Sequence, residues 1–401
     1  MTQETAIPLR MSDDVATRID GVAQGICSRA SAGDASGTFP HEDMAALAKA
    51  GLLALEVPSE LGGLGQNSAQ ANDVFRALGA LNSSTAQVFF VHSVNLRTIL
   101  HLAGPEQKER FLGAVVSDNA RFGVAASEHG QTVLEWNCKM QRVDGGYRLN
   151  GTKHFCTGHE GSDWMMVFSA LDTAPSLMEG VIICMVPTAA EGVTLNGDWD
   201  AMGQRQTASG SVTFDNVFVP DADVFGEPGM IMRIQPALWG PYYQSAFCAL
   251  HMGMARGALE AAIDYARNKT RPWPSAGVER ASFDPFIQRT VGDLHAKVSA
   301  GDLMSQRADE AVVHIERGII SRDEGAVRIA EAKVMTTEIA LDVTSTVFQV
   351  CGARAAYRVN NIDRFYRSAR TLTLHDPVEW KRQEIGDYLL NDRAPLPTFY
   401  S

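Results

Sequence analysis

Hydrophobic periodicity changes twice along this 401-residue chain, and that change limits the fold more than any other sequence feature. Residues 12–115, and the residues after about 228, carry apolar side chains at helical spacing, as in "SAFCALHMGMARGALEAAIDYARNK". Between about 120 and 220 the apolar residues alternate or form short runs of strand length, as in "SGSVTFDNVFVP". The order predicts a helical region, a β-rich region and a second region of long helices.

This order and the length of the chain predict three domains, because 401 residues exceed one simple domain. We expect an N-terminal α-helical domain over residues 1–118, a middle β-sandwich or barrel domain over residues 119–228, and a C-terminal four-helix bundle over residues 229–401. In the first domain, Pro40 marks the first turn of a helix and Gly51 its end. In the second, "VDGGYRLNG" predicts a hairpin around an Asp-Gly turn.

Charge and composition exclude several classes of partner. A formal net charge of −12 repels phosphate backbones, so no nucleic-acid partner is expected. The chain shows neither a secretory h-region nor an apolar run of membrane-spanning length, so we predict a cytoplasmic protein that does not bind membranes. Six scattered cysteines and ten histidines without ligand spacing predict reduced thiols and no metal site. The glycines of "ELGGLGQNS" lack the third glycine of a dinucleotide fingerprint, so a Rossmann site is not expected either.

Several segments together resemble the acyl-CoA dehydrogenase superfamily, which has the same three-part order. They are "AGLLALEVPSELGGLGQ", "AASEHG" and "GYRLNGTKHFCTG". A closer resemblance, to the flavin-dependent monooxygenase branch and its dibenzothiophene monooxygenases, rests on "VLEW" (133–136), "DWDAMGQRQTASGSVTFDNV" (198–217), "ARNKTRPW" (266–273), "DRFYRSARTLTLHDPVEWK" (363–381) and "PLPTFYS".

The resemblance implies an acyl-CoA dehydrogenase-like fold and a homotetramer. It also implies a two-component monooxygenase that receives reduced flavin, either FMN or FAD, from a separate flavin reductase. With O2 as co-substrate, a flavin hydroperoxide would oxygenate a small hydrophobic aromatic or heteroaromatic substrate at sulfur, nitrogen or carbon.

The stretch "RTLTLHDPVEWK" separates this chemistry from dehydrogenation. In the dehydrogenases this region carries a tyrosine, a catalytic glutamate and a glycine, which become His375, Asp376 and Pro377 here. Aspartate is one methylene shorter than glutamate, and a base out of hydrogen-bond reach is ineffective. An imidazole such as His375 can instead donate to a peroxide and relay its proton, with Asp376 fixing its orientation.

Three alternatives remain at this point. Asp376 can simply cap a helix that begins at Pro377. The protein can also be an acyl-CoA dehydrogenase that uses Asp376 as a displaced base. Finally, it can be a non-catalytic flavin-binding scaffold whose partner performs the chemistry.

The resemblance also assigns residues to the flavin ring. Phe155 would pack against the ring, and Thr157 would donate a hydrogen bond to its central nitrogen or to the peroxide. The alternative is an ordinary turn in which the threonine bonds its own backbone. Ser127 would lie at the polar edge of the flavin. Trp199 would line the cleft on the flavin side, or pack as an ordinary β-domain tryptophan.

Other candidates are more distant along the chain. His92 is either a third catalytic residue, beside His375 and Thr157, or a core histidine in an apolar helix. Arg205, Lys269 and Arg271 are candidates to bind the flavin phosphate; the alternatives are a surface salt bridge for Arg205 and compensation of a helix dipole for the other two. By resemblance, Gln349 and Gly352 stand where the distal half of the flavin meets a second subunit.

Overall fold

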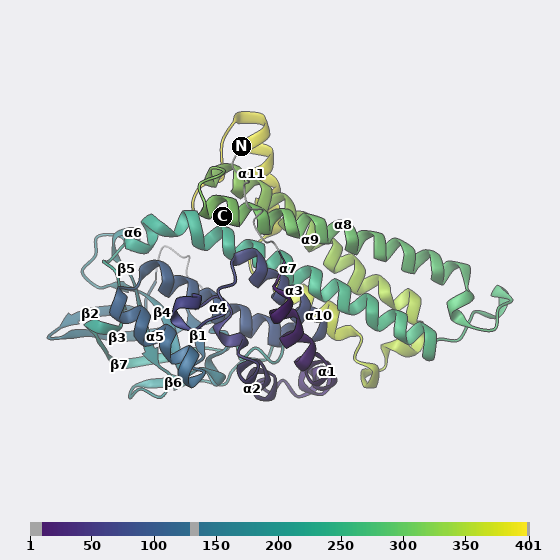
Figure 1. Cartoon of the computed structure of the whole chain (residues 1–401), viewed down its shortest axis with the longest axis horizontal. Coiled ribbons are helices and arrows are strands. Elements are labelled where there is room, and N and C mark those ends of the chain that lie inside the picture. Colours follow the sequence, from purple (N-terminus) through teal and green to yellow (C-terminus); the bar gives the residue numbers. More distant parts are fainter. Residues whose placement is uncertain (1–9, 129–135, 399–401) are drawn as a thin grey trace.

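The computed structural model describes residues 10–128 and 136–398, and its elements follow the order helices, strands, helices (Figure 1). Most of the segment "VLEW" therefore lies outside the described residues, and only Trp136 of it falls within them. Among the described helices, none combines the length and the apolar character needed to cross a membrane.

The N-terminal region is built from helices that precede the first strand. The α-helices are α1 (Asp13–Ser36), α2 (His41–Lys49), α3 (Ser68–Leu81), α4 (Ser83–Leu102) and α5 (Pro105–Asp118). As predicted, α2 begins directly after Pro40 and ends before Gly51, which adopts a left-handed φ of 72°. Asn67 begins α3 in a capping box, because its side chain accepts the Gln70 N–H while the Gln70 side chain returns to the Asn67 N–H.

The middle region is one connected sheet within the described residues. Its strands are β1 (Phe122–Ala125), β2 (Lys139–Val143), β3 (Gly146–Lys153), β4 (Trp164–Leu171), β5 (Val181–Pro187), β6 (Val193–Leu195), β7 (Val212–Pro220) and β8 (Val224–Phe225), with the short helix α6 (Leu177–Gly180) before β5. The strand order is β6-β7-β3-β2-β4-β5-β8, and β1 pairs in parallel with β4. The predicted turn at Asp144 and Gly145 joins β2 to β3.

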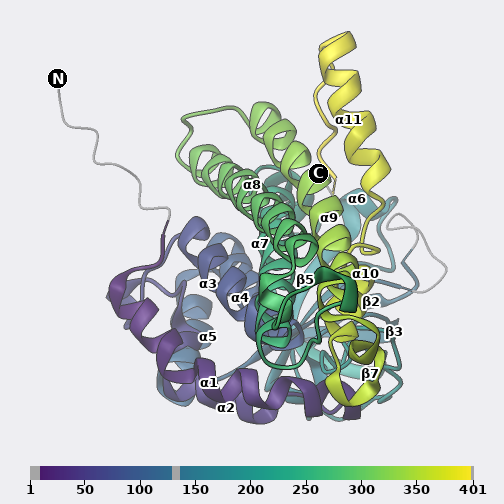
Figure 2. The same cartoon turned by 90° about the vertical axis from the view of Figure 1, so that its right-hand side faces the viewer.

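The C-terminal region is dominated by long helices that run side by side away from the sheet (Figure 1). They are α7 (Met230–Asn268), α8 (Pro285–Glu316) and α9 (Arg322–Cys351), followed by α10 (Asp363–Leu372) and α11 (Val378–Asn391). The 39 residues of α7 correspond to about 58 Å at 1.5 Å per residue. Figure 2 shows the far end of α11 projecting beyond the other helices, and Leu390 near that end is 84% exposed.

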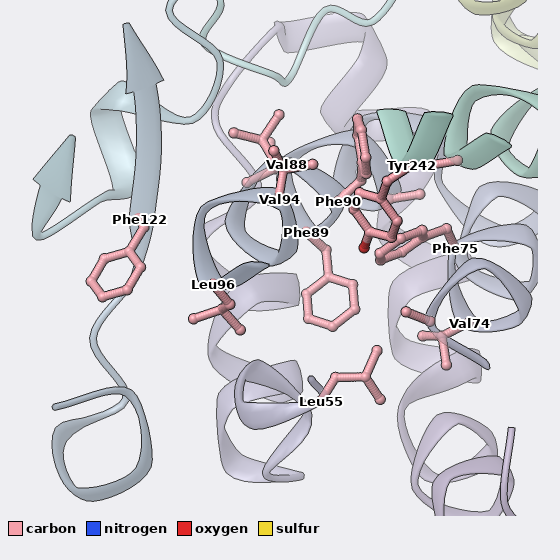
Figure 3. Close-up of a cluster of buried hydrophobic side chains, with 14 of the residues drawn as sticks. Leu55, Val74, Phe75, Val88, Phe89, Phe90, Val94, Leu96, Phe122 and Tyr242 are labelled. Carbon is pink, nitrogen blue, oxygen red and sulfur yellow. The ribbon is translucent and has the colours of Figure 1, made fainter. Parts of the chain in front are cut away.

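A shared apolar core connects these regions (Figure 3). Phe75 from α3 meets Phe89 and Phe90 from α4 edge to face, with ring centroids 5.8 and 5.5 Å apart. Tyr242 from α7 and Phe122 from β1 belong to the same buried cluster. Because one cluster holds helices from both ends of the chain and a strand of the sheet, side chains from all three regions are fixed relative to one another.

Candidate active site

His375 lies in the short connection between α10 and α11, at the end of a column of aromatic rings. Its ring stacks on Tyr243, with centroids 5.4 Å apart and planes at 28°, and Tyr243 stacks in turn on Trp239 at 4.8 Å. The edge of Phe247 packs against the imidazole at 4.6 Å. The His375 side chain is 34% exposed and lines a cavity of about 610 Å³. The imidazole is therefore held rigidly while one side of it faces open space.

Asp376 fixes the orientation of that imidazole. Its buried carboxylate lies 3.2 Å from His375 Nδ1 and accepts a hydrogen bond from Lys333 Nζ at 3.1 Å. Burial alone would raise the pKa of Asp376, but the charge of Lys333 and the hydrogen bond from His375 outweigh it and hold that pKa well below its usual range. Since an ionised carboxylate only accepts, the hydrogen sits on Nδ1, and Nε2 of the neutral ring is the basic nitrogen.

The alternative in which Asp376 caps the last helix is not what the structure shows. α11 begins at Val378, with Pro377 at its N-cap position and no side-chain cap, while the Asp376 carboxylate points to Lys333. The same pairing makes Asp376 a poor general base, because a carboxylate whose pKa is held low binds a proton weakly.

A turn after β3 carries the residues assigned to the flavin ring. Phe155 has a left-handed φ of 55°, uncommon for a bulky residue, and its side chain is 55% exposed. Its ring meets Trp199 edge to face at 6.3 Å. Thr157 is buried just below, with Oγ1 2.8 Å from Ser209 Oγ. Ser127 joins the same turn, because its carbonyl accepts the His154 N–H at 2.8 Å. The structure thus brings these four predicted residues together.

One loop connects this turn to the helix that leads to His375. The Trp199 indole N–H donates to the Gln204 carbonyl at 2.9 Å, and the Gln204 N–H donates to Ser368 Oγ on α10 at 3.2 Å. The Ser84 hydroxyl, at the start of α4, donates to the Gln204 side chain at 3.2 Å. α10 ends three positions before His375. The turn after β3 and the imidazole are therefore both connected to the 198–210 loop, directly or through α10.

His92 occupies a different environment from the one predicted for a catalytic group. It is buried in α4, its Nε2 lies 2.9 Å from the Leu53 carbonyl, and its Nδ1 accepts the Phe122 N–H at 3.1 Å. Burial lowers the pKa of His92 to about 4. Both nitrogens are therefore engaged by backbone groups of the same chain, and the arrangement matches the core histidine that the sequence also allowed.

Arg205 forms the surface salt bridge that was predicted as its alternative role, because its Nη1 lies 3.4 Å from the exposed Asp200 carboxylate. Its Nε donates to the Asp34 carbonyl at 2.8 Å and its Nη1 to the Ala201 carbonyl at 3.2 Å. These contacts engage Nε and Nη1 of the guanidinium, so Arg205 ties the 198–210 loop to the end of α1.

The other predicted phosphate ligands lie at the far end of the bundle, where α7 ends. Lys269 and Arg271 line a groove of about 710 Å³ together with Arg267, Arg280 and Arg354, with the acidic Glu279 among them. The Arg354 guanidinium donates to the Lys269 carbonyl at 2.7 Å, which joins this end of α7 to the segment after α9. Gln349 and Gly352 belong to the same end of α9, although the groove lining does not include them.

Sequence reasoning missed Lys333 and the hydroxyl groups of Thr207 and Ser209. A signal for Lys333 existed, since Ile329, Ala330, Thr336 and Thr337, three and four positions away, are all on the buried face of α9. A lysine on such a face requires a buried acidic partner. Nothing in the sequence indicates which of the 47 acidic residues that partner is.

Comparison with known proteins decides the family. Models for the N-terminal, middle and C-terminal domains of acyl-CoA dehydrogenases match residues 18–119, 122–217 and 245–380. The chain belongs to the acyl-CoA dehydrogenase family. Within this family it is 38% identical, over 92% of its length and 91% of the relative, to a dibenzothiophene monooxygenase of Mycolicibacterium goodii.

Other members of the acyl-CoA dehydrogenase family agree with this placement. A Pseudomonas putida protein named probable FMNH2-dependent monooxygenase SfnC is 32% identical over 92% of both chains. The crystal structure of FMN-bound TdsC from Paenibacillus sp. A11-2 has a TM-score of 0.92 and 34% identity, and the match covers 97% of this chain and all of TdsC; TdsC has also been solved with FMN and indole. These relationships confirm the predicted fold and the predicted enzyme class, a flavin-dependent monooxygenase.

Proposed function

We propose that this protein is a two-component monooxygenase that receives reduced FMN from a separate flavin reductase in the cytoplasm and oxygenates a fused heteroaromatic substrate at sulfur, nitrogen or carbon. The observation that carries the proposal is the environment of His375 in the connection between α10 and α11. An imidazole with a fixed tautomer faces a cavity, while Asp376, at the position of the dehydrogenase base, is ion-paired with Lys333 and only weakly basic. The site suits moving a proton at an oxygen atom better than removing one from carbon.

The residues present fit a flavin. Phe155 offers an exposed ring from a fixed turn, Thr157 offers a hydroxyl oxygen beneath it, and the groove at Lys269 and Arg271 offers several cations to a phosphate. FMN is favoured over FAD because SfnC is named as FMNH2-dependent and TdsC was solved with FMN. When bound, reduced flavin would supply the two electrons that activate dioxygen, so that one oxygen atom of O2 enters the substrate and the other leaves as water.

The two ends of the flavin are assigned to different chains. His375 packs on Tyr243 and Phe247, whereas the cationic groove begins at Lys269. Lys269 follows Phe247 by 22 positions, which correspond to about 33 Å of helix and exceed the length of FMN. A cofactor that uses both regions would therefore join two subunits, which supports the proposed homotetramer.

His375, Thr157 and the aromatic column have separate roles in the proposed reaction. Nε2 of His375 accepts or returns the proton at the oxygen that is transferred, while Asp376 keeps the hydrogen on Nδ1. Tyr243 and Phe247 pack against the imidazole and hold its ring in place, and the proposed substrate is a flat aromatic molecule. Indole in the TdsC complex is a molecule of this kind.

The test is a single turnover with isotopically labelled oxygen. Protein loaded anaerobically with photoreduced FMN is mixed with ¹⁸O2 and either dibenzothiophene or indole, and products are analysed by mass spectrometry. We expect one labelled oxygen atom in the product. Reduction of protein-bound oxidised FMN by an acyl-CoA, without labelled product, would overturn the proposal in favour of a dehydrogenase.

Complementation tests the sharing of the cofactor. A His375→Ala chain keeps its groove, and an Arg271→Ala chain keeps its imidazole. When the two are co-expressed, mixed assemblies regain sites that contain both intact parts, so activity at limiting FMN should exceed that of either variant alone. Activity no higher than that of the separate variants would show that each chain binds its flavin alone.

A further inference from the structure

Three buried hydroxyl groups form a chain that starts at Thr157 and ends on a backbone carbonyl. Thr157 Oγ1 lies 2.8 Å from Ser209 Oγ, and Ser209 Oγ lies 2.7 Å from Thr207 Oγ1. Thr207 Oγ1 donates to the Gln204 carbonyl oxygen at 2.9 Å. All three hydroxyl-bearing residues are buried, so no bulk water competes for these hydrogen bonds.

The carbonyl at the end of the chain sets its direction. A carbonyl oxygen only accepts, so the Thr207 hydrogen points to Gln204, and the Thr207 oxygen must then accept from Ser209. Ser209 has donated its single hydrogen, so its oxygen accepts from Thr157. The Thr157 hydrogen is therefore engaged inside the protein, and its oxygen offers lone pairs to a ligand. This direction reverses the donor role predicted for Thr157 from the sequence.

We propose that this hydroxyl chain makes the site selective for reduced over oxidised flavin, with Ser209 and Thr207 as positioning residues that act through Thr157. The inference rests on the proposed function and on the assignment of Thr157, from the resemblance, to the central nitrogen N5 of the flavin. N5 carries a hydrogen in reduced flavin and a lone pair in oxidised flavin. An accepting Thr157 matches the N5–H of the reduced form and opposes the lone pair of the oxidised form.

The size of the selectivity follows from counting hydrogen bonds. To donate to oxidised flavin, Thr157 must turn its hydrogen away from Ser209, and the chain loses one hydrogen bond; if all three hydroxyl groups reverse, the lost bond is the one from Thr207 to the Gln204 carbonyl. That carbonyl keeps two other donors, the Trp199 indole at 2.9 Å and the Thr207 N–H at 3.2 Å. The reversal therefore costs one neutral hydrogen bond, which corresponds to a preference of roughly 2- to 10-fold.

Thr207→Val is the decisive variant, because it keeps the side-chain shape and removes a hydroxyl that does not touch the flavin. Without the Thr207 oxygen, the Ser209 hydrogen turns to Thr157, and the Thr157 hydrogen turns outward to the ligand. We measure dissociation constants for oxidised FMN and, anaerobically, for photoreduced FMN in the full-length protein. The ratio of the oxidised to the reduced constant should fall roughly 2- to 10-fold. By linkage, a tenfold fall makes the two-electron potential of bound FMN about 30 mV more negative.

Two further variants and one control complete the test. Ser209→Ala should lower the ratio in the same direction, and Thr207→Ser, which restores a hydroxyl, should return it to the wild-type value. The control is Thr344→Val, which removes another buried hydroxyl that donates to a backbone carbonyl, here at Ala340 on α9. It should leave the ratio unchanged.

The outcomes separate this inference from the proposed function. A wild-type protein that binds neither form of FMN would contradict the proposed function itself. A wild-type protein that binds FMN, with a folded Thr207→Val variant of unchanged ratio and potential, would overturn the hydroxyl chain alone. If Thr207→Val does not fold, an unchanged ratio in Ser209→Ala has the same meaning.

Discussion

Lys333 and Asp376 form an ion pair in which both side chains are buried, with Nζ of the lysine 3.1 Å from Oδ1 of the aspartate. The lysine stands in the middle of α9, and the aspartate follows α10, 43 positions later in the chain. The pair holds the connection that carries His375 against the bundle. It therefore links the stability of the fold to the orientation of the imidazole.

Lys333→Met should be strongly destabilising. The variant leaves the Asp376 carboxylate buried without its cation, and breaking a buried pair in this way costs about 3–5 kcal/mol. The free energy of unfolding in urea measures the effect. The control is Lys297→Met, which removes a half-exposed lysine paired with Asp293 and Asp342 and should cost at most about 1 kcal/mol. Equal losses in the two variants would show that the Lys333 pair has no special role.

His375→Ala should lower product formation by about 10²- to 10⁴-fold, the range expected when a general acid–base group is removed. Binding of FMN should be retained, because the ring and phosphate contacts lie on other residues. The yield of oxygenated product per reduced FMN oxidised measures the effect, since flavin that fails to transfer oxygen releases hydrogen peroxide instead. An exposed histidine on α8, His295, provides the matched control His295→Ala, which should keep the wild-type yield.

The buried His92 should make stability depend on pH. Its pKa is about 4 in the folded protein and near 6.5 when unfolded, so the unfolded chain binds more protons between these values. Its contribution is fully present above pH 6.5 and is lost as pH falls towards about 4, by up to about 3 kcal/mol.

Urea unfolding over this pH range checks the prediction. His92→Asn, whose side-chain oxygen can still accept the Phe122 N–H, should show a smaller loss of stability between pH 6.5 and 4. The loss should not vanish, because burial also holds the pKa of His251 well below its ordinary value. A slope identical to that of the wild type would mean that His92 titrates normally in the folded state.

Arg271→Ala should weaken binding of FMN by roughly 10- to 100-fold, the loss expected for one charge-assisted hydrogen bond to a phosphate. Riboflavin, which has the same ring system without the phosphate, should bind wild type and variant equally. Fluorescence titration with both ligands separates the phosphate contact from general damage. Arg317→Ala, which removes an exposed arginine after α8, should change neither affinity. A parallel loss for riboflavin would contradict the assignment of the groove to phosphate.

The sequence predicted those parts of the structure that depend on neighbouring residues. The two changes of periodicity, the limits of α2 and the Asp144–Gly145 turn were all correct, because each follows from local spacing or from a backbone preference. The turn that gathers Phe155 and Thr157 was predicted as a site through its resemblance to relatives.

The sequence did not predict the interactions of side chains whose partners are distant along the chain. Asp376 has the spacing of a helix cap, but Lys333 offers it a buried charge partner, and that interaction outweighs capping of an accessible helix end. Arg205 was a candidate phosphate ligand, but its Nε donates to the carbonyl of Asp34, 171 positions away. Local sequence contains no trace of either partner.

The length of α7 has a consequence for how this enzyme is handled in solution. Under the proposed arrangement, the long helix places the groove at Lys269 and Arg271 against a neighbouring subunit. A single chain then has the imidazole part of one site and the phosphate part of another, and neither site is complete. Dilution alone should then switch the enzyme off while every domain is still folded, and specific activity should rise with enzyme concentration until assembly is complete. Under this arrangement, the activity of each chain depends on the total concentration of the protein, because a second chain completes its site.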